Sequence, residues 1–230
     1  MNEKEKREVG LVCLPLPVEG FSTRWKWHNQ ILKLVDLLSM NKIIYLTLKN
    51  LKTRLAKQPI QWVQRESGYL KPCTCALYKG ATPDQIYSFV KETGFFLPTS
   101  YIDFLKMHDG AILFQDQSEY VESPWYIFGL EEIMEYSEQN ELPPNLYAIA
   151  KFNQTIIFVD SSLLKEGRED YLFEGATFDH EYEAMNLNFE LWFERLIVSQ
   201  GARFWHWNNY SLKNYQPEEI SLDELNETEE

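Results

Sequence analysis

Basic residues are scarce in the second part of this sequence. Residues 81–230 contain 8 Lys and Arg against 29 Asp and Glu, a net charge of −21, whereas residues 1–80 contain 14 against 6, a net charge of +8. The two parts sum to the −13 of the whole chain. So acidic a part repels the phosphates of nucleic acid and anionic lipid surfaces, and it attracts basic proteins. We therefore predict a basic protein partner, no nucleic acid and no membrane.

Cysteine and long apolar runs are also scarce. The chain has three cysteines, an odd number that does not suggest a disulfide framework. The longest apolar stretch, residues 31–48, is interrupted by charged side chains and does not fit a membrane-spanning helix. The first residues mix acids with bases and are broken by Pro15 and Pro17, unlike a secretory signal. These absences predict a cytoplasmic protein with reduced thiols.

Catalytic and metal-binding motifs are absent as well. The sequence has no glycine-rich phosphate loop, no nucleophile elbow and no His-Glu-x-x-His motif. The histidines are scattered along the sequence. Acids flank His180, but neighbours in sequence need not form an acid–base pair in a cleft. Cys73 and Cys75 are closer in sequence than zinc ligands usually are, and they fit buried thiols of a strand better. We predict no enzyme activity, no metal and no cofactor.

We predict that residues 1–78 form a basic helical extension. Residues 25–57 have the apolar period of a helix pair, or of one long helix with a break near residues 39–41, and Pro59 ends it. Its Lys and Arg side chains fill the outer positions, which favours a solvated helix face over a nucleic-acid site. Because its charge is opposite to that of the rest, we expect the extension to dock on the acidic part.

We predict that residues 79–200 form a second domain, which begins with two short helices. Thr82 and Gln85 form a capping box at the start of the first helix. Gly94 fits the left-handed residue that ends it. Pro98 then opens a helix that ends before Gly110. The pair must pack on another element, and the strands downstream are the candidates.

The strands of this domain are short and close in sequence. Residues 147–152 and 155–160, separated by Asn153 and Gln154, predict a β-hairpin. Residues 125–128 and 171–173 predict two further strands. A last helix follows Asn188 and has an apolar face of Phe189, Trp192, Phe193, Leu196 and Ile197. This order predicts an α+β fold with a largely antiparallel sheet that helices cover on one side.

Residues 201–230 predict an aromatic segment followed by an acidic tail. Aromatic clusters such as residues 204–207 and residues 25–28 can stack on bases or sugars. Such stacking sites need basic residues around them, and these clusters have few. Packing in the core, or contact between the two termini, fits them better. Residues 218–230 hold seven acids and no base, which predicts a solvated tail.

A series of short motifs in residues 79–200 follows the order of a known family. The motifs are Gly80-Ala81-Thr82, Leu97-Pro98, Tyr101, Phe104-Leu105, His108-Asp109-Gly110, Phe128-Gly129-Leu130-Glu131-Glu132-Ile133, Tyr147-Ala148-Ile149-Ala150, Ile156 to Asp160 and Asn188-Phe189-Glu190-Leu191-Trp192-Phe193. Together they resemble the SUKH superfamily, which includes the yeast cell-wall-synthesis regulator and many bacterial immunity proteins. The chain departs from the family at Asn153 and Gln154, where the hairpin usually holds Gly and Asp, and the basic extension lies outside the resemblance.

The resemblance implies binding rather than catalysis, because bacterial members are similar to inhibitors that are encoded beside polymorphic toxins, many of them nucleases, and that occlude them. We therefore expect an immunity-type binding protein. A regulatory scaffold of the same fold is the alternative, and an uncharacterised enzyme is a third.

The segment 130–140 agrees with a binding role. Its helical period places Leu130, Ile133, Met134 and Ser137 on an inner side and glutamates outside, with no lysine. Like charges one turn apart cost an isolated helix about 0.2–0.5 kcal/mol per pair. Selection for solubility alone explains such acidity equally well. The predicted partner-binding residues are Glu131, Glu132, Glu135, Glu138, Asp109 and Glu122.

Overall fold

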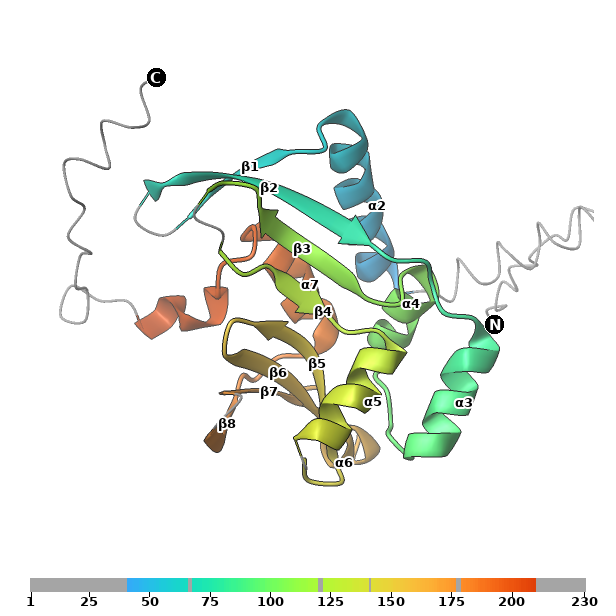
Figure 1. The fold of residues 1–230 in the computed structure, drawn as a ribbon. Coiled ribbons are helices and arrows are strands. Elements are labelled where there is room, and N and C mark those ends of the chain that lie inside the picture. Colours follow the sequence, from blue (N-terminus) through green and yellow to red (C-terminus); the bar gives the residue numbers. More distant parts are fainter. Residues whose placement is uncertain (1–40, 66–67, 120–121, 141, 177–178, 210–230) are drawn as a thin grey trace, which may run out of the picture. The chain divides into compact units, whose positions relative to one another are not determined.

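The computed structural model describes residues 41–65, 68–119, 122–140, 142–176 and 179–209 (Figure 1). The described residues all belong to one compact unit. The predicted first helix of the basic extension, the aromatic residues 25–28 and the acidic tail lie outside the described residues. The described part has an α+β fold, as predicted, with six α-helices and one antiparallel sheet.

The sheet is a meander in which each strand pairs with the next one along the chain. All eight strands are antiparallel to their neighbours, in the order β1 to β8. The strands are β1 (Gln61–Gln64), β2 (Leu70–Leu77), β3 (Ala111–Asp116), β4 (Trp125–Ile127), β5 (Leu146–Phe152), β6 (Thr155–Asp160), β7 (Leu172–Ala176) and β8 (Asp179–Ala184).

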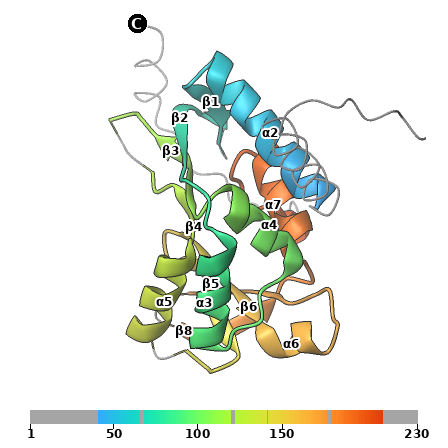
Figure 2. The same cartoon turned by 90° about the vertical axis from the view of Figure 1, so that its right-hand side faces the viewer.

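The helices form two unequal layers. Helices α2, α4 and α7 contact one another behind the sheet in Figure 1, whereas α5 lies in front and contacts β5 and α3. Figure 2 shows the same two layers from the side. The helices are α2 (Lys42–Lys57), α3 (Pro83–Thr93), α4 (Thr99–Met107), α5 (Leu130–Gln139), α6 (Ser161–Lys165) and α7 (Phe189–Val198), followed by the 3-10 helix η2 (Phe204–Asn209).

The predicted caps of the first two helices of the domain are confirmed. The amide of Thr82 donates to Oε1 of Gln85 at 2.8 Å, and the amide of Gln85 donates to Oγ1 of Thr82 at 3.3 Å. Gly94 ends α3 with a φ of 70°, which a residue with a side chain adopts only at a cost. Helix α4 begins directly after Pro98. Side chains thus satisfy free backbone groups at the start of α3, whereas α4 has no side-chain cap.

The predicted hairpin between β5 and β6 is confirmed as well. Phe152 pairs with Thr155, so the loop has two residues. Asn153 has a φ of 52°, a left-handed conformation that asparagine tolerates better than most residues. Asparagine thus replaces the glycine that this kind of turn usually needs.

The core behind the sheet is built largely from aromatic rings. Rings of Phe104 and Phe193 lie 5.2 Å apart between α4 and α7. On the sheet side, Trp125 of β4 lies 5.8 Å from Trp192 of α7, and its Nε1 donates to the carbonyl of Gly201 at 2.8 Å. The predicted apolar face of the last helix is confirmed, because all five of its residues are buried.

The aromatic segment after α7 also packs into this core, as one of the two alternatives predicted. The ring of Trp205 lies 5.9 Å from Trp125 and 6.5 Å from Trp192. Trp205 Nε1 and His206 Nε2 both contact Oε2 of Glu174, at 2.7 and 2.6 Å. Packing on the core thus explains the partial burial of residues 204–206, whereas Trp207 is exposed.

The second basic helix belongs to the same packed unit. Ile44, Leu48 and Leu51 of α2 are buried, and the helix contacts α4 and α7. Each such side chain contributes about 1.5–3 kcal/mol when it leaves water. Asn41 caps the helix, because its Oδ1 accepts from the amides of Ile43 and Ile44, each at 3.0 Å. With β1 and β2, α2 extends the fold N-terminally beyond residue 79.

Candidate functional site

Helix α5 has one apolar side and one acidic side. Leu130 and Ile133 are buried, and Tyr136 packs on Phe128 and Phe158 with ring distances of 5.7 and 6.3 Å. Three glutamates, Glu131, Glu135 and Glu138, are exposed. No base lies in α5, and none of the three forms an ion pair within the described part of the chain. The acidic side of α5, as we name these three residues, is therefore uncompensated.

Two other predicted site residues cap the start of α5. The amide of Gly129 donates to Oε2 of Glu132, and the amide of Leu130 donates to Oδ1 of Asp109, both at 2.9 Å. Both carboxylates lie where the free amides and the helix dipole favour negative charge. Burial raises the pKa of Asp109, the Leu130 amide opposes this rise, and the charge of Glu131 adds to it.

Gly129 is needed for this cap. A Cβ atom at this position would lie 2.7 Å from the carbonyl oxygen of Asp109 and 2.8 Å from Oε2 of Glu132. Any side chain would therefore push away one of the groups that cap α5. The structure thus brings Asp109, Glu131 and Glu132 together at one end of the helix, although Asp109 is 22 residues from Glu131 in sequence.

Glu122 belongs to a different cluster. Its Oε2 lies 3.2 Å from Nε of Arg65, which also donates to the carbonyls of Phe114 and Gln200, at 3.3 Å each. Burial alone would raise the pKa of the neighbouring Asp116, but hydrogen bonds from the amides of Ser118 and Glu122 outweigh it and lower that pKa. Sequence reasoning missed Arg65 as a partner of Glu122, because 57 residues separate them and no motif connects them.

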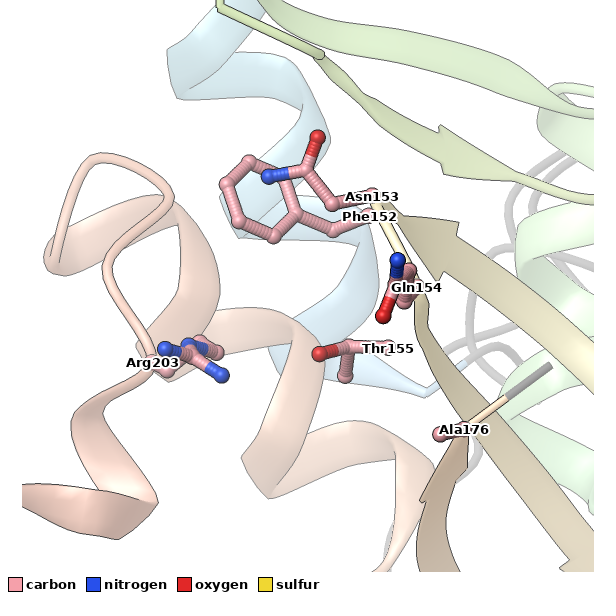
Figure 3. Close-up of a pocket in the computed structure, with 6 residues that line it drawn as sticks. All are labelled: Phe152, Asn153, Gln154, Thr155, Ala176 and Arg203. Atoms are coloured by element: carbon pink, nitrogen blue, oxygen red, sulfur yellow. The ribbon is translucent and has the colours of Figure 1, made fainter. Parts of the chain in front are cut away.

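A small polar hollow lies at the tip of the β5–β6 hairpin (Figure 3). It encloses about 620 Å³. Figure 3 shows Arg203 across the hollow from Gln154 and Thr155. Among the described residues no acid forms an ion pair with Arg203. One half-exposed guanidinium beside amide and hydroxyl groups can hold a single anionic group weakly. The residues that line it are Phe152, Asn153, Gln154, Thr155, Ala176 and Arg203.

The thiols of β2 lie on one side of the strand, as its extended backbone requires. Cys73 is buried and Cys75 is half-buried. Burial raises the pKa of both thiols, so both stay protonated at neutral pH and are poor metal ligands or nucleophiles. In the part of the chain that the structure covers, no group of three or more His, Cys, Asp or Glu is placed to hold a metal ion. Within the same residues, no helix combines the length and apolar character needed to cross a membrane.

The sequence of this chain matches known proteins. Residues 80–195 match the SMI1 / KNR4 family (SUKH-1). The chain is 28% identical over 184 residues to Uncharacterized protein YobM of Bacillus subtilis (strain 168), which covers 76% of this chain and 98% of that protein. It is 31% identical over 130 residues to Uncharacterized protein YnaB of the same organism, and this match covers 56% of this chain and 84% of that protein. The family match includes α3 to most of α7 and spans half of the chain, so this chain belongs to the SMI1 / KNR4 family (SUKH-1).

Proposed function

We propose that this chain is an immunity-type protein that binds and occludes a cognate toxin of basic character through the acidic side of α5. The observation that carries the proposal is that Glu131, Glu135 and Glu138 are exposed without a base among the described residues to pair with them. The resemblance to bacterial immunity proteins supports binding rather than catalysis. Reduced thiols of Cys73 and Cys75 agree with action in the cytoplasm.

Folding alone does not require these three glutamates. Asp109 and Glu132 already satisfy the free amides at the start of α5. Glu131 with Glu135, and Glu135 with Glu138, are like-charge pairs one turn apart, and each costs about 0.2–0.5 kcal/mol in an isolated helix. A surface that serves only folding mixes the two signs of charge. A basic partner would neutralise these charges and offset the cost.

An acidic helix side suits a toxin that acts on nucleic acid. The substrate-binding surface of a nuclease is basic, because it must neutralise phosphates. Carboxylates placed one turn apart compete with those phosphates for the same Lys and Arg side chains. Opposite charges also speed the encounter of the two proteins, by an amount that falls as salt is added. Occlusion of the basic surface then blocks the substrate without any chemistry in the inhibitor.

The test is a measurement of association rates with the toxin domain encoded by the neighbouring gene. We expect the triple variant E131K/E135K/E138K to bind at least about tenfold more slowly than the wild type at low salt. The difference should shrink at about 0.15 M salt, where charges are screened beyond about 8 Å. The same triple variant should fail to protect cells that express the toxin.

The matched control reverses the same number of exposed acids elsewhere. Glu166, Glu181 and Glu183 are exposed and lie after α6 and in β8. The variant E166K/E181K/E183K has the same net charge as the first, so an equal loss of rate would contradict a role for α5 itself. An unchanged rate in both variants would remove the electrostatic basis of the proposal. A gene without a toxin gene beside it would favour a regulatory scaffold of the same fold.

A further inference from the structure

Strands β1 to β4 have an apolar face that no described helix covers. In Figures 1 and 2, α2, α4 and α7 lie on the opposite side of these strands, and α5 lies farther along the sheet, over β5. Three large side chains of these strands are strongly exposed, Trp62 (58%), Leu70 (61%) and Tyr126 (42%). Monomeric proteins seldom leave so much aromatic and aliphatic surface together in water.

The strand register places these side chains on one face. Side chains alternate between faces along a strand, and directly paired residues point to the same side. Trp62 pairs with Pro72, and Leu70 lies two residues before Pro72 in β2. Farther along β2, Ala76 pairs with Ile112, which in turn pairs with Tyr126. We call these six residues, Trp62, Leu70, Pro72, Ala76, Ile112 and Tyr126, the open face. The uncharged polar residues Gln64, Thr74 and Gln115 share its register and lie among them.

The open face has no charge of its own. The four strands contain one acid, Asp116, and one base, Lys71. Both lie in the alternate register of their strands, and Nζ of Lys71 is 3.5 Å from Oδ2 of Asp116. The side chain of Asp116 is fully buried. The two charges therefore neutralise each other away from the open face.

Tyr78 connects the open face to the acidic end of α5. It continues the alternation of Ala76 and is 42% exposed. A Cβ at Gly110 would lie 3.2 Å from the ring of Tyr78 and 3.1 Å from the amide nitrogen of Gly129, so both residues lie close to Gly110. Gly129 in turn contacts Asp109 and Glu132, the residues that cap α5. Uncharged apolar surface thus borders directly on a cluster of carboxylates.

We infer that the open face is the apolar centre of the partner-binding surface and that the start of α5 is its acidic border. This inference rests on the proposed function and adds the part of the surface that holds the complex together. The partner is a basic protein surface that presents an apolar side chain next to its lysines or arginines. Interfaces of this kind have a centre rich in Trp and Tyr and poor in charge, with charged residues around it.

Charge decides between this partner and a second copy of the chain. A symmetric dimer through the open face would place the same patch of each copy against the other. The bordering carboxylates of Asp109, Glu131 and Glu132 would then meet the uncharged open face of the other copy, or its carboxylates, with no base to pair with, which costs free energy. A basic partner gains attraction from the same groups. The acidic border therefore favours a basic protein of different sequence.

The first arm of the test uses the toxin domain that tests the proposed function. The variant W62S/L70S removes the two most exposed side chains of the open face. We expect its dissociation rate to rise at least about tenfold with little change in association rate, because apolar centres act mainly on dissociation. The control, L191S/V198S, changes two exposed residues of α7 (42% and 63%) and should dissociate like the wild type. Equal effects of both variants, or no effect of W62S/L70S, would overturn the inference.

If the toxin domain does not bind the wild type, that result contradicts the proposed function but does not test the open face. A second arm tests the open face in that case. The probe is a synthetic peptide with alternating Lys and Leu, compared with one of alternating Lys and Ser. Tighter binding of the Lys–Leu peptide to the wild type and to L191S/V198S than to W62S/L70S supports the inference. Equal binding of the Lys–Leu peptide to all three proteins, no binding, or a wild-type dimer that W62S/L70S dissociates overturns it.

Discussion

The two faces of strands β1 to β4 both contain aromatic residues, but they have opposite surroundings. On the covered face Trp125 is 1% exposed and touches Trp192, whereas its neighbour Tyr126 on the open face is 42% exposed. The covered face lies against the layer of α2, α4 and α7, and Trp192 of α7 supplies the ring that Trp125 contacts (Figure 1). An aromatic residue in a strand thus does not by itself indicate a core. On the open face no described helix covers the same residue types, and Trp62, Leu70 and Tyr126 are exposed.

The largest effect should separate the neighbours Trp125 and Tyr126. We expect W125A to lower the free energy of unfolding by about 3–5 kcal/mol, because it leaves a cavity and frees the carbonyl of Gly201. Y126A should stay within about 0.5 kcal/mol of the wild type. Urea unfolding followed by far-UV circular dichroism measures both. Similar losses in the two variants would show that the open face is covered in solution.

The next effect tests whether α2 belongs to the covered face. Leu48 is fully buried and Leu46 is 40% exposed on the same helix. We expect L48A to lower the free energy of unfolding by about 2–5 kcal/mol, and L46A to change it by about 0.5 kcal/mol or less. Both substitutions leave helix propensity almost unchanged, so their difference reports packing on α4 and α7. If L48A were as mild as L46A, α2 would contribute little to the unit.

A smaller, pH-dependent effect should come from His108 at the end of α4. Its Nδ1 donates to the carbonyl of Tyr78 at 2.6 Å, and its Nε2 is buried without a partner in the described structure. Burial lowers the pKa of His108, and the charge of Lys52 adds to this. The unfolded chain therefore takes up this proton more readily, so stability is full above a pH of about 6.5 and falls as the pH drops below it.

The variant H108N isolates this contribution. Its amide can donate to the carbonyl of Tyr78 as Nδ1 does, but it does not titrate. We expect the free energy of unfolding of the wild type to fall more steeply than that of H108N between about pH 7 and pH 5. Parallel pH profiles of the two proteins would show that His108 is free to protonate in the folded state.

Local signals in the sequence predicted the elements that depend on neighbouring residues. The capping box of Thr82 and Gln85, the left-handed Gly94 and the two-residue hairpin loop all involve groups within three residues of one another. The amphipathic helix after Asn188 was also predictable, because its five buried residues repeat with the helical period. Such features are set by backbone geometry and need no knowledge of distant contacts.

Features that depend on distant residues were not predictable in the same way. Strand β3 has two successive buried residues, Leu113 and Phe114, at a bulge where Phe114 has a φ of 56°, and this breaks the alternation that marks a strand. The acids at the start of α5 were predicted as contact residues, but Asp109 and Glu132 also cap the helix. The capping role depends on the contact between the turn after α4 and Gly129. No periodic pattern in the sequence predicts this contact.

The meander gives the chain an uneven order of assembly during synthesis. Each strand can pair with the one made just before it, because all neighbours in the sheet are neighbours in sequence. Helix α2 differs, since it ends at Lys57 and its partner α7 begins at Phe189, 132 residues later. At about 5–20 residues per second, a ribosome needs about 7–26 s to make that stretch. During this interval the apolar stripe of α2 lacks its full packing partner, so this helix exposes the nascent chain to aggregation until α7 has been made.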